Sequence, residues 1–212
     1  MRPSLVSALL LLAVPALAGD AITPGTHKDW RDIDEVEIVK VFALSSYDGL
    51  IVQPFDKSQV QMPPETENTF EPTREAVATS DIHFTSELRK KLQERRGRFQ
   101  VEQATEAAAS PATPAADPAT SAPAPKRLLL RGKLVKLNAG SKAARYFVGF
   151  GAGAAGAKYE LELVDASTNE VLVRLTHEKR AGTGMFGGNY TDVMARSVKE
   201  VASDVAKALA AF

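Results

Sequence analysis

Residues 159–178 read YELELVDASTNEVLVRLTHE, and this stretch decides the fold. Both of its halves alternate between apolar and polar side chains, and the polar segment 165–170 between them has the composition of a turn. Such alternation predicts an antiparallel hairpin with one face in the core and one in water. Cross-strand ion pairs worth under about 1 kcal/mol each are expected on the wet face. The candidates are Glu160 and Glu162 with Arg174, or with Arg131 and Lys133 of a neighbouring strand.

Four further strands are predicted before this hairpin in the chain. Residues 127–137 are rich in leucine, and residues 36–44 are rich in Val and Ile. The apolar run 49–55 ends at a proline, as a strand does, and Phe99 and Val101 alternate with polar neighbours. A mixed, largely antiparallel sheet is therefore expected.

Two amphipathic helices are predicted to cover this sheet. After a polar, proline-rich loop over 53–79, the first helix is expected to begin near Thr79 or Ser80 and to end at Gly97. Its apolar face recurs every fourth residue, at Phe84, Leu88 and Leu92. The second helix is expected to be capped by Thr191, with Asp192 beside it. Its apolar stripe comprises Met194, Val198, Val201, Val205, Ala208 and Phe212.

Residues 104–125 interrupt this pattern with alanine, proline, serine and threonine and with no large apolar side chain. Such a segment cannot bury enough surface to offset its ordering entropy, which predicts disorder. Residues 48–212 are therefore expected to form a single α/β (α+β) domain interrupted by a disordered insertion at 104–126, with 19–47 as a lead-in. Two small domains joined by a tether are the alternative.

Residues 1–18 have the layout of a secretory signal. Arg2 precedes a ten-residue apolar run, which is too short to cross a bilayer, and Ala16 and Ala18 suit a cut after Ala18. An uncleaved anchor or a buried helix is the alternative. The chain has no cysteine, which is unusual for a eukaryotic secreted domain and favours the periplasm. We therefore expect export across the inner membrane, with no transmembrane span in the mature chain.

Composition and motifs argue against several classes of function. The 212 residues carry 26 basic and 26 acidic groups, which opposes bulk attraction to nucleic acid. Gly151, Gly153 and Gly156 match a dinucleotide fingerprint, but an alternating strand follows where the phosphate-binding helix is required. No cofactor, no metal site and no catalytic constellation is visible. The histidines lack metal-ligand spacing, and the serines lack a nucleophile-elbow frame: His27, His83, His177, Ser45 and Ser46.

A possible partner-contact surface follows from two glycine-rich segments, 151–156 and 182–188, which flank the predicted hairpin. Pairing of the hairpin would bring them together at one end of the sheet. Five apolar residues are expected to gather there: Phe147, Phe150, Met185, Phe186 and Tyr190. They either plug the edge of the core or form an adaptable patch that recognises a protein or a lipid-like ligand.

Residues 89–98 contain six cations among interleaved glutamates at the carboxyl end of the first predicted helix. Cations at that end interact favourably with the helix dipole, so a solvated face explains them, and a phosphate or lipopolysaccharide contact is the alternative. The cluster comprises Arg89, Lys90, Lys91, Arg95, Arg96 and Arg98.

Several segments together resemble a bacterial cell-envelope family, domain-of-unknown-function family 4410, which is carried by lipoproteins and exported proteins. The matching segments are IVQPF at 51–55, the helix end at 92–97 with FQV at 99–101, RYFVGFGAG at 145–153, ELVD at 162–165 and TNEVL at 168–172. The resemblance implies a small mixed α/β domain similar to the amino-terminal domain of the Tol-Pal propeller protein or to the periplasmic part of the curli secretion pore. It implies no reaction and no site residues, and this chain lacks the lipidated cysteine of many such proteins.

These observations predict a non-catalytic periplasmic domain that binds an unidentified envelope protein. A binding protein for a small apolar or anionic envelope ligand is the alternative.

Overall fold

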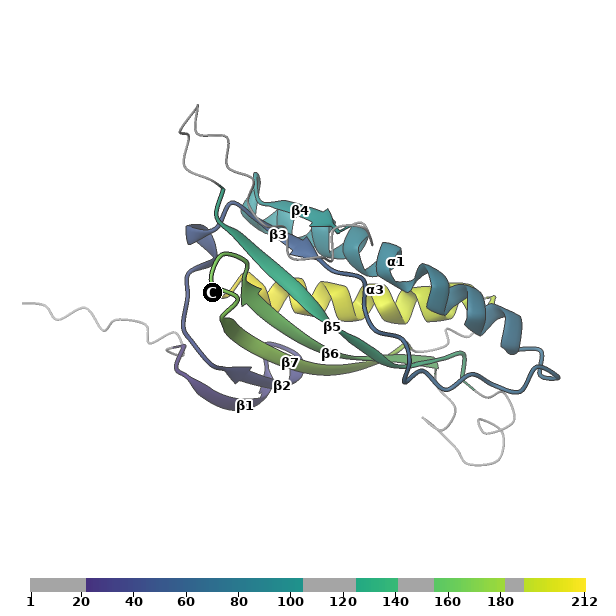
Figure 1. Ribbon diagram of the computed structural model, residues 1–212. Helices are drawn as coiled ribbons and strands as arrows, with labels where there is room; N and C mark the ends of the chain where they lie inside the picture. The colour runs from purple at the N-terminus through teal and green to yellow at the C-terminus, as the bar shows by residue number, and fades with distance from the viewer. Residues whose placement is uncertain (1–21, 105–124, 141–154, 182–188) are drawn as a thin grey trace, which may run out of the picture.

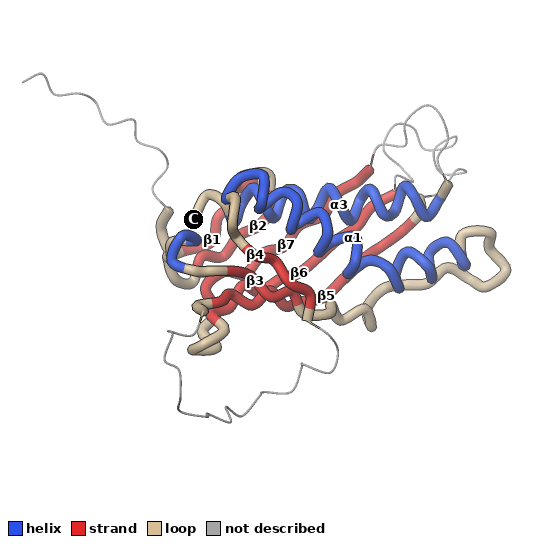
Figure 2. The backbone as a smooth tube through the Cα atoms, turned by 90° about the horizontal axis from the view of Figure 1, so that it is seen from above, coloured by secondary structure: helices blue, strands red, loops and turns tan. Residues whose placement is uncertain are grey.

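A mixed sheet of seven strands and two long helices make up the part of the chain that the computed structural model describes, which is residues 22–104, 125–140, 155–181 and 189–212. Both helices lie on the same face of the sheet (Figures 1 and 2). In chain order the elements are β1 (Gly25–Trp30), β2 (Ile33–Ile38), the 3-10 turn η1 (Leu44–Ser46), β3 (Gly49–Val52), α1 (Phe70–Arg96), β4 (Gln100–Gln103), β5 (Arg127–Asn138), β6 (Ala155–Asp165), β7 (Val171–Ala181) and α3 (Tyr190–Leu209).

The strand order across the sheet is β1-β2-β7-β6-β5-β3-β4. β3 pairs in parallel with β4 and with β5, and all other neighbours are antiparallel. The predicted mixed, largely antiparallel sheet with two covering helices is therefore confirmed. The predicted hairpin is also confirmed, because β6 and β7 pair through Leu161 with Leu175 and Tyr159 with His177.

One sheet contains strands from the predicted lead-in and from both sides of the Ala/Pro-rich segment. β4 precedes the Ala/Pro-rich segment and β5 follows it, yet both pair with β3 in one sheet. The predicted lead-in contributes β1 and β2, and β2 pairs with β7. β2 covers Ile33–Ile38, so the strand predicted over 36–44 begins earlier and ends earlier. The predicted signal and most of the predicted insertion lie outside the described residues.

Helix α1 begins at Phe70, so the prediction of a start near Thr79 or Ser80 is wrong, and the loop predicted over 53–79 is confirmed only up to residue 69. The first turns of α1 bury Thr73, Ala76 and Ser80 in place of large apolar residues. Small and polar residues at these positions give no hydrophobic signal in the sequence. The end at Gly97 is as predicted, with φ at 57°, a conformation that glycine adopts without strain.

Helix α3 presents the predicted apolar stripe from Met194 to Ala208, and Phe212, the last predicted member, lies three residues beyond the end of the helix; all of these residues are buried. Its cap differs from the prediction, because the side chain of Asn189 accepts a hydrogen bond from the backbone N–H of Thr191. The helix therefore begins at Tyr190, one residue before the predicted cap.

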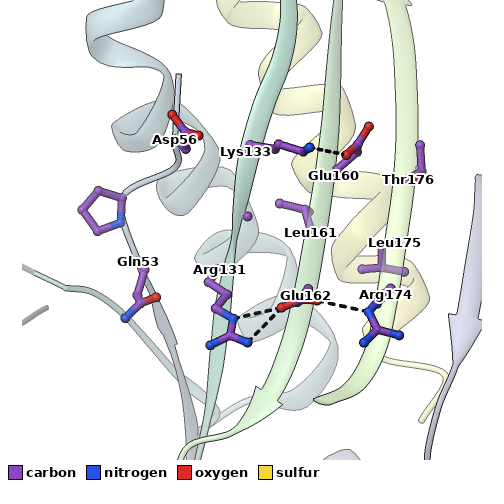
Figure 3. A pocket seen from close by; sticks show the side chains of 12 residues that line it. Gln53, Asp56, Arg131, Lys133, Glu160, Leu161, Glu162, Arg174, Leu175 and Thr176 are labelled. Carbon is purple, nitrogen blue, oxygen red and sulfur yellow. Dashed lines mark hydrogen bonds and ion pairs between the residues drawn. The ribbon is translucent and has the colours of Figure 1, made fainter. Parts of the chain in front are cut away.

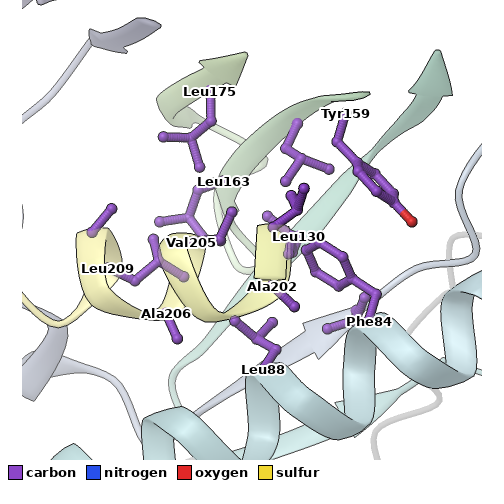
Figure 4. Close-up of a cluster of buried hydrophobic side chains, with 14 of the residues drawn as sticks. Phe84, Leu88, Leu130, Tyr159, Leu163, Leu175, Ala202, Val205, Ala206 and Leu209 are labelled. Carbon is purple, nitrogen blue, oxygen red and sulfur yellow. The ribbon is translucent and has the colours of Figure 1, made fainter. Parts of the chain in front are cut away.

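The core fills the space between the two helices and the sheet (Figure 4). Phe55, Phe84 and Tyr159 form an aromatic group with ring centroids 4.9 to 5.3 Å apart. Alternate residues of β5, β6 and β7 are buried beneath the helices, so the intervening side chains point to the opposite face. The side chains of that opposite face form the candidate site.

Candidate functional site

The open face of the sheet, the one opposite the helices, carries charged side chains in register across four adjacent strands. β5, β6, β7 and β2 lie next to one another in that order. Their pairing aligns two sets of residues at right angles to the strands. We call these the first charged row (Arg131, Glu162, Arg174, Glu37) and the second charged row (Lys133, Glu160, Thr176, Glu35).

The first charged row alternates in sign and is ion-paired throughout. Arg131 contacts Glu162 at 3.0 Å, and Glu162 accepts a hydrogen bond from Arg174 Nε at 3.1 Å (Figure 3). On the other side, Arg174 Nη1 lies 2.9 Å from Glu37 Oε2. Each side chain therefore has an oppositely charged neighbour on the next strand. This network fixes long side chains that would otherwise be mobile.

The second charged row is less completely paired. Lys133 Nζ lies 2.9 Å from Glu160 Oε2. The backbone at Asp56 pairs in parallel with that at Lys133 for a single residue, which places Asp56 beside this row. Glu35, opposite Thr176, is exposed and has no ion pair with any residue that the structure describes. This row therefore presents one unpaired carboxylate to solvent.

The pKa values follow from these contacts. Burial raises the pKa of Glu162, but the hydrogen bonds from Arg174 and Arg131 outweigh burial and hold it below its usual value. The hydrogen bond to Glu37, followed by that to Glu162, raises the pKa of Arg174. Hydrogen bonding from Lys136 lowers the pKa of Glu178. All three shifts favour the charged forms, so the face keeps its charge pattern at neutral pH.

A shallow hollow of about 560 Å³, open to solvent, lies between the two rows (Figure 3). Both rows contribute to its lining, together with Gln53 and Pro54. Gly132 shapes it, because a Cβ atom at this position would lie 2.2 Å from the carbonyl oxygen of Glu160. No other residue type fits there unless the backbone moves.

A second hollow, of about 360 Å³, lies where α1 ends beside residues 44–48, and Arg96 and Arg98 line it. Two cations of the predicted basic cluster donate to backbone carbonyls: Arg89 to Val101 at 2.8 Å, and Arg96 to Ala210 at 2.6 Å. These contacts give both arginines a structural role at strand and helix ends.

The predicted partner-contact residues Phe147, Phe150, Met185 and Phe186 lie outside the described part of the chain. Tyr190 is described as the first residue of α3, where it is half-buried and packs on the core. The residues that flank the two glycine-rich segments are neighbours, since Ala155 pairs with Ala181. Gly156 lies within β6, so a strand and not a phosphate-binding helix follows the glycine motif, as expected.

No sequence pattern indicates that His177 is buried between carboxylates from two other elements. Its Nδ1 lies 3.3 Å from Asp34 and its Nε2 lies 3.2 Å from Asp204 of α3. Across the described ranges, no three His, Asp or Glu side chains are grouped so that they could hold a metal ion. Neither α1 nor α3 combines the length and hydrophobicity that crossing a membrane requires.

A family model described as "Domain of unknown function (DUF4410)" matches residues 50–188, which include β3 to β7 and both charged rows apart from β2. The chain belongs to the DUF4410 family. No curated protein is significantly similar to it in sequence.

Among solved structures, the DUF4410 chain is similar to PelC of Paraburkholderia phytofirmans, described as a dodecamer, with 16% identity and a TM-score of 0.43 over 80% of this chain and 96% of PelC. It is also similar to a Xanthomonas campestris protein of the DUF330 family (10% identity, TM-score 0.38, 74% and 81% covered). A third is the hypothetical protein CT253 from Chlamydia trachomatis (13% identity, TM-score 0.36, 77% and 99% covered). The expected resemblance to the Tol-Pal propeller protein rests on sequence alone.

Proposed function

We propose that this DUF4410 chain is an exported, non-catalytic module that binds a protein of the cell envelope through the open face of its sheet. The observation that carries the proposal is the first charged row, four side chains held in an alternating pattern across four strands. A fixed pattern of charge on a rigid sheet discriminates between partners, because a mismatched partner places like charges together.

Two features favour a protein partner over a reaction at this face. The hollow is shallow and open, whereas small-molecule sites enclose most of their ligand. Glu162 and Arg174 each hold their charged form through ion pairs within the row, whereas a general acid or base needs a pKa near the working pH. The proposal of export rests on the layout of residues 1–18, and the periplasm is the compartment that the absence of cysteine favours.

Site-specific crosslinking in intact cells tests the proposal. A photo-crosslinking residue at Thr176, in the hollow, should yield a discrete adduct with a protein, whereas one at the exposed Ser86 of α1 should not. Arg174→Glu should abolish the adduct, because it reverses the centre of the first charged row. Arg74→Glu is the matched control, since Arg74 is exposed on α1 and, among the residues that the structure describes, pairs with Glu71 of the same helix. Equal adducts from both positions, or none from Thr176, would contradict the proposal.

A binding protein for a small anionic ligand is the second candidate, and the hollow beside Arg96 and Arg98 favours it. Arg98 is exposed and has no ion pair within the described residues. Isothermal titration with inorganic phosphate tests it: binding should be lost in Arg98→Ala and retained in Arg95→Ala. The patch at Phe147, Phe150, Met185, Phe186 and Tyr190 stays a sequence-based prediction of a further contact.

A further inference from the structure

The charge pattern of the open face is complementary to itself. Rotation by 180° about an axis between β6 and β7, parallel to these strands, exchanges β5 with β2 and β6 with β7. From this symmetry we propose that a second copy of this chain occupies the open face, in a face-to-face dimer about that axis. This inference rests on the proposed function, because it names the partner of the same surface.

The first charged row meets its own reverse without a like-charge contact. Arg131 of one copy lies opposite Glu37 of the other, and Glu162 lies opposite Arg174. Each of these opposite-charge contacts occurs twice, because a two-fold interface repeats every contact.

The second charged row also meets its own reverse without a like-charge contact, and the match continues to residues on either side of the four strands. Lys133 lies opposite Glu35, and Glu160 lies opposite Thr176. The flanking strands continue the match, since Asp56 beside Lys133 lies opposite Lys28, which pairs with Glu35 in β1. The unpaired carboxylate of Glu35 therefore finds a cation in the second copy.

Leu129 and Val39, at the two edges of the level beside the first charged row, add apolar surface that association can bury. Leu129 pairs with Val164, and the backbone N–H of Val39 donates to the carbonyl of Leu172 of β7 at the corresponding level, whereas Val164 and Leu172 themselves are already buried. Val39 and Val41 are 42% and 44% exposed. The same rotation brings Leu129 of one copy against Val39 of the other, so apolar side chains meet apolar side chains.

The charges also select the axis. A two-fold axis along the rows, at right angles to the strands, would set Arg131 against Arg131 and Glu162 against Glu162. Juxtaposed like charges oppose association, so only the axis parallel to the strands gives an attractive arrangement. Because most contacts are ion pairs between exposed groups, the dimer should weaken as salt increases.

Sedimentation equilibrium of the purified chain, with two reciprocal charge reversals, tests the inference. Glu35→Lys breaks no ion pair within the described chain, yet it sets two lysines against each other twice in the dimer. Lys133→Glu removes the pair with Glu160 within the chain and likewise sets two glutamates against each other twice in the dimer. Each variant alone should raise the dimer Kd on the order of tenfold. An equimolar mixture of the two should restore dimerisation, because the mixed dimer has opposite charges at both contacts.

The controls separate this inference from the proposed function. Arg74→Glu on α1 should leave the wild-type Kd unchanged, circular dichroism should show that each variant is folded, and about 1 M NaCl should weaken the wild-type dimer. A chain that stays monomeric, or a mixture no tighter than the separate variants, overturns the second-copy assignment. A monomeric chain that still crosslinks from Thr176 to a different protein overturns this inference alone and leaves the proposed function standing.

Discussion

The hydroxyl of Tyr47 donates a hydrogen bond of 2.8 Å to Oδ2 of Asp165, and thereby joins the segment before β3 to the turn between β6 and β7. Both residues are buried. Asp165 also accepts hydrogen bonds from the backbone N–H groups of Ser167 and Thr168, so one carboxylate orders the hairpin turn and ties it to a distant segment. This contact therefore links the end of the sheet near the β6–β7 turn to the segment that leads into β3.

Tyr47→Phe should lower the free energy of unfolding by about 1–3 kcal/mol, because it leaves a buried carboxylate with one donor fewer. Burial, followed by the hydrogen bond to Asp165, raises the pKa of Tyr47 to about 12. The phenol is therefore protonated and donating throughout the neutral range. Urea denaturation at pH 7 measures the loss, with Ser86→Ala, which removes an exposed hydroxyl from α1, as the control. An unchanged midpoint in Tyr47→Phe would show that this hydrogen bond contributes nothing.

Asp165 should make stability depend on pH in a defined direction. Hydrogen bonding from Ser167 lowers its pKa and outweighs burial, and Tyr47 adds to the lowering. A carboxylate with a depressed folded-state pKa stabilises the protein above its unfolded pKa, which is about 3.9, and the stabilisation is lost as pH falls through the folded pKa.

The difference in unfolding free energy between wild type and Asp165→Asn should thus be about 1–3 kcal/mol at pH 7. It should shrink below about pH 4. Chemical denaturation at several pH values measures it, and a difference that grows towards acid pH would reverse the assigned sign.

Gly132→Val should destabilise the sheet by about 1–3 kcal/mol or more, because the new Cβ would collide with the backbone of β6. Gly156→Ala is a graded control between the neighbouring strands β6 and β7, since its Cβ would lie 3.2 Å from the carbonyl oxygen of Lys179. Thermal unfolding followed by circular dichroism should rank wild type above Gly156→Ala and Gly156→Ala above Gly132→Val. Equal melting temperatures for all three proteins would contradict the close approach of the neighbouring backbone to Gly132 and Gly156.

Phe212→Ala should destabilise the protein by about 3 kcal/mol and shift the tryptophan emission to longer wavelength. The ring of Phe212 lies 5.3 Å from that of Trp30 and stacks on Phe42 at 4.6 Å, so β1 packs against a residue three positions beyond the end of α3. Trp30 is the single tryptophan, which makes the signal specific. An unshifted emission spectrum in the folded variant would contradict this packing.

The hairpin and the apolar stripe of α3 could be predicted because one face of each is apolar at a regular period. β1 could not, since GTHKDW has no such period and forms an edge strand whose residues are mostly exposed. The start of α1 could not be predicted either, because the buried residues of its first turns, Thr73, Ala76 and Ser80, are small or polar and give no apolar period.

The open face was only partly predictable. Ion pairs of Glu160 and Glu162 with residues on β5 and β7 follow from strand alternation, and the structure confirms them for Glu162 with Arg131 and Arg174 and for Glu160 with Lys133. The complete rows also require β2, whose place beside β7 depends on packing between segments far apart in the chain. His177 illustrates the same limit, because its carboxylate neighbours come from two elements that no local pattern connects to it.

Lysine reactivity in intact cells tests most directly the claim that a partner covers the open face. Acetylation would be quantified by mass spectrometry for Lys133 of the open face and for Lys90 and Lys199 of the helical face, both in cells and in dilute purified protein. Of these three lysines, only Lys133 should be less acetylated in cells than in dilute purified protein. Protection of Lys90 and Lys199, with Lys133 as reactive in cells as in solution, would contradict it.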